Sequence, residues 1–197
     1  MRRFESSIIL AAILVGSFAS TTEATIAEWS IADGGNGHLY EAVAVPEVIS
    51  WTEASEAANL AGGYLATITS EAENDFVFNL VNDDMYWKDQ TATSTIGPWL
   101  GGYQLPGSVE PSGGWTWVTG ESFSFTNWDG SGPDNQGGDQ DYLHFGWSKP
   151  RNGKWNDLEN DGRSLTQAYV VEYVPEPTTL VLLAMGGLCL RSRRRRK

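Results

Sequence analysis

Apolar residues recur at helical spacing in two stretches of the first half of the chain. The first stretch follows Ser50, which with Glu53 has the spacing of a capping box, the reciprocal side-chain contact that starts a helix. The face of this predicted helix that would be buried carries four apolar residues: Trp51, Ala54, Ala58 and Ala61. Gly62 follows the last of them and ends the predicted helix.

Ser70 and Glu73 repeat the capping-box spacing and open a second predicted helix. Its expected buried stripe consists of Ala72, Phe76, Val77 and Leu80. Ahead of both helices, residues 38–43 alternate between polar and apolar as a strand does, and they follow a turn-forming stretch at residues 33–37.

After Trp87 the pattern changes to short aromatic strands separated by glycine. Of the 22 glycines, 14 lie between Gly97 and Gly162. Strands are expected at residues 99–102, 115–117, 142–145 and 169–173. Two helices followed by this region predict an α+β domain with small antiparallel sheets and a long glycine-rich loop region.

Nine tryptophans lie between Trp29 and Trp155. We expect most of them to fill the core, with one or two left exposed, because large aromatic side chains bury much apolar area. Trp128 and Trp155 flank polar segments and are expected to anchor those segments rather than to stack on a sugar.

Both ends of the chain have the composition of targeting segments. Residues 1–24 combine a basic start, an apolar run at 8–15 and small residues at 17–19, which predicts a secretory signal peptide. The other end runs through the apolar stretch 178–190 into an arginine cluster. As a helix this stretch would reach about 20 Å, short of the roughly 30 Å of a hydrocarbon core, so we expect transient anchoring in the cytoplasmic membrane. A single domain at residues 25–174 remains between the two ends.

The domain is strongly acidic. Between residues 24 and 177 the chain has 23 acidic and five basic residues, a formal charge of −18. Such a charge repels nucleic acid and anionic lipid, so neither is expected as a partner. The only cysteine, Cys189, lies in the C-terminal tail, so the exported domain is expected to lack disulfides and to be held by packing, or by packing plus metal.

Motifs typical of enzymes are missing from the sequence. The histidines, His38 and His144, lie on predicted strands outside any His-Glu-x-x-His pattern, and the chain has no Gly-x-Ser-x-Gly elbow. Carboxylate pairs are numerous by composition alone and therefore do not identify a glycosidase. We predict a non-enzymatic protein and keep polysaccharide cleavage as a remote alternative.

Five segments, in order and spread over residues 29–173, resemble the C-type lectin-like domain. They are residues 51–54 with 62–68, the Trp-Leu-Gly-Gly strand at 99–102, the loop from 125 to 135, Lys-Trp-Asn-Asp at 154–157, and the closing strand 169–173. The resemblance implies the C-type lectin-like fold. Tyr142 and Val171 stand where the family has two of its cysteines, so apolar packing would replace the disulfides.

By this resemblance, Ca²⁺ would be held by oxygens of the long loop and of the Asn-Asp pair. The ligand positions fall on Gly132, Asp134, Gln140, Asn156 and Asp157. Gly132 has no side chain and Gln140 is neutral, whereas calcium prefers six to eight oxygens with several carboxylates. A weak or remodelled calcium site is therefore expected, built on Asp134, Gln140, Asn156 and Asp157, with Asp139 or Asp141 as possible substitutes after a one-residue slip of the loop.

The same resemblance implies the ligand site. Sugar hydroxyls would contact Asp134, Asn135, Asn156 and Asp157, and the family's cis proline would correspond to Pro133. The type of sugar is left open, because the residue pair that selects it is incomplete at Gly132.

The C-terminal order of Pro-Glu-Pro, apolar segment and arginine cluster resembles the bacterial PEP-CTERM sorting signal. By that resemblance Pro175, Glu176 and Pro177 form the sorting motif, residues 175–197 form the sorting tail, and an exosortase-type enzyme would process it. The expected location is the cell surface or the extracellular matrix.

Two functions remain in competition. The first is an exported module that binds carbohydrate or exopolysaccharide with the assistance of calcium. The second keeps the same fold as a calcium-independent structural or protein-binding component of the surface or matrix.

Overall fold

A computed structural model describes residues 23–175, and its first helix, α1 (Trp51–Leu60), forms as the apolar spacing predicts. Ser50 Oγ accepts the Glu53 N–H at 3.2 Å, and Glu53 Oε2 accepts the Ser50 N–H at 2.9 Å, which completes the capping box. Trp51, Ala54 and Ala58 are buried. Ala61 was expected on the same face but is exposed, because it caps the end of the helix.

The buried face of the second helix, α2 (Glu71–Leu80), is more polar than its spacing predicts. Ala72 is exposed, and Glu73, Asn74 and Val77 are the buried residues. The Asn74 amide fits the core because its Oδ1 accepts the Trp155 Nε1–H at 2.7 Å and its Nδ2 donates to the Gly153 carbonyl at 3.1 Å. A buried amide with hydrogen-bond partners costs little. The predicted stripe was wrong at Ala72, whereas Val77 is buried and Phe76 and Leu80 pack against the core.

The described residues form nine strands: β1 (Glu23–Glu28), β2 (Leu39–Ala44), β3 (Tyr64–Leu65), β4 (Lys88–Asp89), β5 (Ser94–Gln104), β6 (Trp115–Trp117), β7 (Tyr142–Ser148), β8 (Trp155–Leu158) and β9 (Ala168–Tyr173). Three 3₁₀ turns, η1 (Ile31–Asp33), η2 (Asp84–Tyr86) and η3 (Gly162–Ser164), lie between them. The strands form one branched sheet with the main order β1-β2-β9-β5-β7-β8, while β3 pairs with β9 and both β4 and β6 pair with β5.

The sheet is mixed rather than purely antiparallel. The last strand, β9, pairs antiparallel with β2 and parallel with β5, where Trp99 lies opposite Tyr169. Strand β5 can also approach β3 closely because residue 101 is glycine: a Cβ there would lie 2.3 Å from the Leu65 carbonyl oxygen. The α+β class and the two helices are confirmed, and the small antiparallel sheets merge into one mixed sheet.

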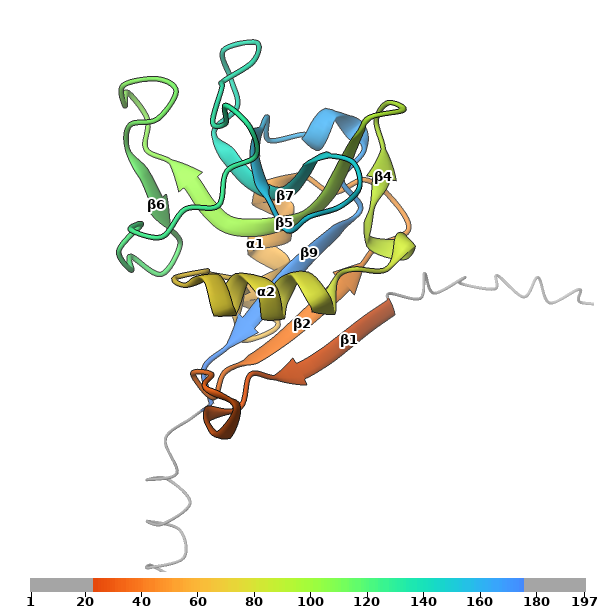
Figure 1. Ribbon diagram of the computed structural model, residues 1–197, viewed down its shortest axis with the longest axis vertical. Coiled ribbons are helices and arrows are strands. Elements are labelled where there is room, and N and C mark those ends of the chain that lie inside the picture. The colour runs from red at the N-terminus through yellow and green to blue at the C-terminus, as the bar shows by residue number, and fades with distance from the viewer. Residues whose placement is uncertain (1–22, 176–197) are drawn as a thin grey trace, which may run out of the picture.

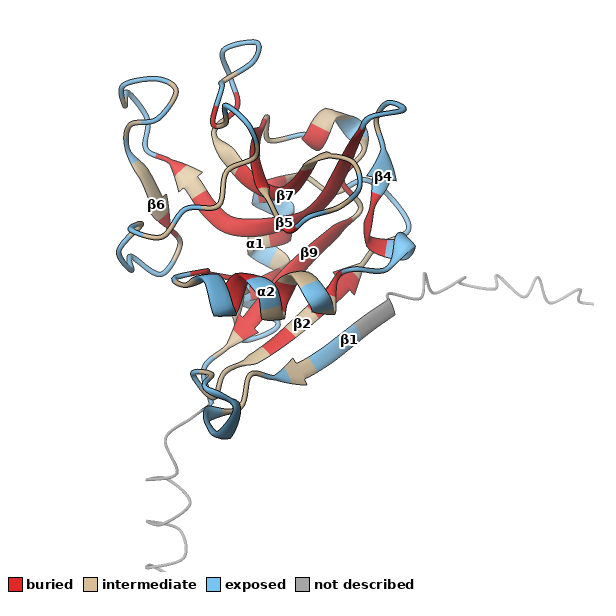
Figure 2. Cartoon of the chain, viewed as in Figure 1, coloured by how far each residue is buried: buried red, intermediate tan, exposed pale blue. Residues whose placement is uncertain are grey.

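The centre of the sheet is buried (Figure 2), and tryptophan side chains fill much of this core. Trp99, Trp117 and Trp155 are fully buried, and none of the nine tryptophans, all within the described residues, is exposed. Trp128 forms an isolated bridge to Trp155 and packs edge-on against it, which fits the expected anchoring role.

The long loops and the C-terminal end of β9 lie at opposite ends of the molecule (Figure 1). The predicted signal peptide, apart from its last two residues, and the sorting tail beyond Pro175 lie outside the described residues. Within residues 23–175 no helix is both long and apolar enough to cross a membrane.

Candidate functional site

A buried carboxylate on β8 holds the long loop against the sheet. Asp157 is fully buried, and its oxygens accept the backbone N–H of Asp134 at 3.0 and 3.1 Å and that of Asn135 at 2.6 Å. Burial raises the pKa of Asp157, although the N–H groups favour its charged form. Because a buried charge must be paired, these contacts fix the position of the loop.

The loop crest is also closed by its own side chains. Asn135 Oδ1 accepts the Gln140 N–H at 3.0 Å, and Gln140 Oε1 accepts the Gln136 N–H at 2.6 Å. Gln136 N–H also donates to Asp134 Oδ1 at 3.2 Å. Three residues that the sequence placed at the site, Asp134, Asn135 and Gln140, are therefore brought together with Asp157.

Asn156 lies beside the glycine that occupies the first ligand position. Its Nδ2 donates to the Asp157 carbonyl at 2.6 Å. A Cβ added at Gly132 would lie 3.6 Å from Asn156 Oδ1, so a side chain at residue 132 would face this amide. The Gly132–Pro133 peptide bond is cis, as the resemblance implied.

Arginine 163, which the sequence analysis did not single out, borders the same network. Its Nε lies 3.0 Å from Glu159 Oε1, and its Nη2 donates to Gln136 Oε1 at 3.1 Å. Gln140 Nε2 donates to the other Glu159 oxygen at 3.3 Å, and the guanidinium lies over Trp147. The sequence signal that could have identified Arg163 is the rarity of basic residues: it is one of five between residues 24 and 177, where the formal charge is −18.

The arrangement does not fit a calcium shell. Both Asp157 oxygens and the Gln140 carbonyl oxygen already accept backbone N–H groups, and Gly132 contributes no side chain. Calcium needs six to eight oxygens, and within residues 23–175 no three acidic, histidine or cysteine side chains are grouped to hold a metal. The Arg163 guanidinium instead supplies positive charge at this edge of the loop.

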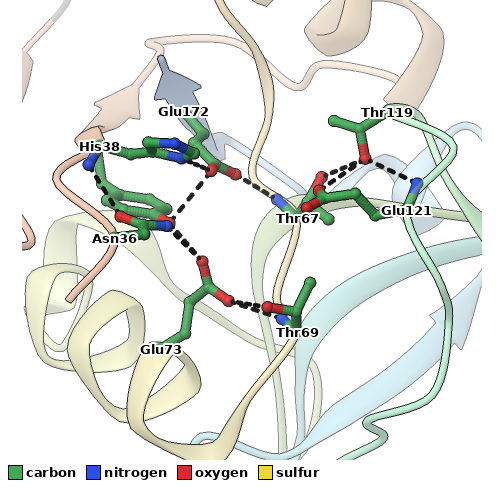
Figure 3. Close-up of polar contacts among 9 residues, drawn as sticks. Asn36, His38, Thr67, Thr69, Glu73, Thr119, Glu121 and Glu172 are labelled. Atoms are coloured by element: carbon green, nitrogen blue, oxygen red, sulfur yellow. Dashed lines mark hydrogen bonds and ion pairs between the residues drawn. The ribbon is translucent and has the colours of Figure 1, made fainter. Parts of the chain in front are cut away.

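A second polar cluster joins α2 to the sheet (Figure 3). The carboxylates of Glu73 and Glu172, both buried, share the Tyr40 hydroxyl as a donor. Burial raises the pKa of Glu172, and the His38 imidazole, whose Nδ1 lies 2.6 Å from Glu172 Oε1, opposes that rise. The Glu73 carboxylate also accepts hydrogen bonds from the Asn36 amide and the Thr69 N–H, and the Glu172 carboxylate accepts one from the Thr67 N–H. These contacts tie together the elements that carry the core, and we assign the cluster a structural role.

His144 is buried on β7 against the edge of Trp99. Its Nδ1 lies 2.6 Å from the Phe145 carbonyl, which can only accept, so Nδ1 carries the proton. Nε2 has no partner among the described residues. Burial lowers the pKa of His144 to about 4.

Two family models match the chain. Residues 47–166 match the Lectin C-type domain, and residues 174–196 match the PEP-CTERM protein-sorting motif. The second match indicates export and a surface or extracellular location.

Named relatives agree with the first match. A perlucin-like protein of Mytilus galloprovincialis is 32% identical over 114 residues, which cover 57% of this chain and 64% of the relative. An alpha-N-acetylgalactosamine-specific lectin of Patiria pectinifera is 31% identical over 96 residues, covering 49% of this chain and 51% of the relative. The chain thus spans less than two thirds of the length of either relative.

Solved structures share the fold. The C-type lectin CEL-I from Cucumaria echinata superposes with a TM-score of 0.52 at 24% identity, covering 71% of this chain and 91% of CEL-I. A structure described as a calcium-independent type II antifreeze protein superposes with a TM-score of 0.50 at 18% identity, covering 70% and 86%. At these identities the likeness concerns the fold alone.

Replacing the carboxylate that holds the loop should destabilise the domain. Asp157→Asn removes one acceptor and turns an N–H donor toward the Asp134 and Asn135 N–H groups. Because hydrogen bonds to charged groups contribute about 1.5 to 3 kcal/mol, we expect a loss of about 2 kcal/mol in the free energy of unfolding, measured by urea denaturation. The control Asp139→Asn, at an exposed residue of the same loop, should change it by less than about 0.5 kcal/mol. Equal losses in the two variants would contradict the role of Asp157.

The guanidinium of Arg163, rather than calcium, should stabilise the loop. Arg163→Met leaves Glu159 and the Gln136 side chain without their partner, so we expect the melting temperature to fall by about 2 to 4 °C. Calorimetry in chelator and in millimolar calcium should give the same midpoint for the wild type. The prediction would be contradicted if the melting temperature of the wild type fell in chelator while Arg163→Met melted at the same temperature as the wild type.

Acidification should weaken the fold through His144. Its folded pKa of about 4 lies below the ordinary value of 6.5, so between these values the unfolded chain binds a proton that the folded protein does not. This contribution to stability is complete above pH 6.5 and is lost as the pH falls toward 4, at about 1.4 kcal/mol per pKa unit. His144→Phe should therefore lose about 2 kcal/mol less than wild type between pH 7 and 4.5 in urea titrations. Parallel pH profiles would refute this.

Proposed function

Because the chain belongs to the C-type lectin domain family, we propose that it is an exported, non-enzymatic module that binds carbohydrate through its long loop. The observation that carries the proposal is the anchoring of Asp134 and Asn135 by the buried Asp157. A loop held in one conformation before binding loses little entropy when a ligand arrives.

Polar atoms for a sugar remain available on this loop and on the adjacent strand β8. Among the described contacts, Asp134 Oδ1 is engaged by Gln136, whereas Asp134 Oδ2 and Asn156 Oδ1 have no protein donor. Sugar hydroxyls can donate to such oxygens, and the exposed Gln136 adds an amide on the same crest. We propose that Asp134, Asn135 and Asn156 contact the ligand, while Asp157 positions them.

The proposal also concerns whether carbohydrate binding requires calcium. The sequence predicts a weak calcium site, and the oxygens of Asp157 and Gln140 are satisfied by backbone N–H groups. We therefore propose that recognition proceeds by direct hydrogen bonds and does not require calcium. Calorimetric titration of residues 25–174 with Ca²⁺ measures this directly.

The route to the surface is proposed from the tail. Pro175, Glu176 and Pro177 lie within the matched sorting motif, which supports processing by an exosortase-type enzyme and transient anchoring through residues 178–190. In the sequence the sorting motif follows β9, and the C-terminal end of β9 lies at the end of the molecule away from the long loop (Figure 1). Anchored there, the domain would present its loop outward, toward carbohydrate or exopolysaccharide of the matrix.

A second candidate function is a calcium-independent structural or protein-binding component of the surface or matrix. The contacts of Arg163 with Glu159 and Gln136 favour it, because they consume polar groups at the loop edge that a sugar would otherwise use.

A glycan array probed in calcium and in chelator separates these functions. We expect wild-type protein to bind a subset of glycans equally in both buffers, and Asp134→Ala to weaken that binding at least tenfold because it removes a ligand oxygen. Asp139→Ala serves as the matched control and should bind as wild type. If no glycan binds in either buffer, carbohydrate binding is rejected and the structural function is left. If glycans bind only in the calcium buffer, calcium-assisted carbohydrate binding is supported instead.

A further inference from the structure

A cavity beside β4 lies apart from the long-loop site and shares no residue with it. Its volume is about 510 Å³, and it is lined by Asn82, Asp89, Thr95, Lys149, Pro150 and Arg151. This volume falls within the range of small-molecule sites and has room for a monosaccharide unit. Two of the five basic residues of the domain therefore line one cavity.

The cations of this cavity are more buried than the acids that pair with them. The Lys149 and Arg151 side chains are 26% and 24% exposed, whereas their partners Asp89 and Asp84 are 73% and 96% exposed. Water screens the exposed carboxylates more than the sheltered cations. Inside the cavity the positive charges of Lys149 and Arg151 therefore act more strongly on a ligand than the negative charges of Asp89 and Asp84 do.

Both cations are held in place and still have free donors. Lys149 Nζ lies 2.6 Å from Asp89 Oδ1 and donates to the Thr91 carbonyl at 3.2 Å, which uses two of its three N–H groups. Arg151 lies over the Trp87 ring at 5.3 Å and donates one N–H group to Asp84, which leaves four N–H groups without a partner among the described residues.

We propose that this cavity binds the acidic group of a sugar, with the carboxylate of a uronic acid as the ligand. The free N–H groups of Lys149 and Arg151 would bind the carboxylate, which suits the planar donor set of arginine. The ring hydroxyls would meet the Asn82 amide, which can donate and accept, and the exposed Asp89 carboxylate, which accepts.

The ligand is expected to be a short acidic segment rather than an extended polyanion. Residues 24–177 carry a formal charge of −18, so most of the domain surface repels a long acidic polymer. The inference rests on export to a carbohydrate-containing surface, as proposed above, but not on the long-loop site.

The test is calorimetric titration of residues 25–174 with trigalacturonate and with galactotriose, its neutral counterpart. We expect trigalacturonate to bind at least tenfold more tightly than galactotriose. Lys149→Ala and Arg151→Ala should each weaken trigalacturonate binding at least tenfold. Lys88→Ala, at an exposed lysine of β4 that does not line the cavity, should stay within twofold of wild type. Melting temperatures of all variants would show that each one is folded.

Two further arms make the outcome decisive. Asp134→Ala on the long loop should leave trigalacturonate binding unchanged, so failure of the cavity and failure of the long-loop site give different results. Inorganic sulfate should compete if the negative charge alone is recognised, which would broaden the ligand to sulfated sugars. Equal binding of the neutral and acidic trisaccharides, or no binding of trigalacturonate at 10 mM, would overturn the proposal.

Discussion

The carboxylate of Asp157 is the interaction on which the binding end of the molecule depends. It lies on β8, at one end of the sheet order, is fully buried, and accepts hydrogen bonds from the backbone of a loop more than twenty residues away. A charge in that position is tolerated only when donors surround it, and the loop supplies them. The strand and the loop therefore stabilise each other. The Asp157 carboxylate of the strand holds the loop in place, and the loop supplies the hydrogen-bond donors that this buried carboxylate needs.

Polar contacts of the same kind replace the disulfides that this acidic domain lacks. Glu73 and Glu172 are buried together and are joined through Tyr40, with His38 beside them, so α2, β2 and β9 are cross-linked by hydrogen bonds (Figure 3). The loop edge uses Arg163 in a similar way against Glu159. Each of these clusters ties together segments that are distant in the sequence, which is the task of a disulfide in a small exported domain.

Periodicity and capping signals were sufficient to predict both helices, and the aromatic and glycine-rich segments predicted the α+β class. The C-type lectin-like fold itself was predicted from the resemblance of five segments to that family. The sequence could not show that Glu73 and Asn74 face the core, because their burial depends on partners such as Tyr40 and Trp155 that lie far along the chain. The same limit applies to the site. Asp134, Asn135, Gln140, Asn156 and Asp157 were predicted from the family resemblance. The backbone donors to Asp157 and the contacts of Arg163 could not be predicted in this way, because they exist only in the folded chain.

The position of β9 has a consequence for how the domain assembles. This strand is the last of the fold, yet it lies between β2 and β5 in the middle of the sheet, and it pairs with residues about 130 positions earlier. Such high contact order means that the sheet cannot close while the chain is still emerging in order from its N-terminus. The central gap is filled only when residues 168–173 arrive, directly ahead of the sorting motif, so the sheet is completed by the last segment of the domain.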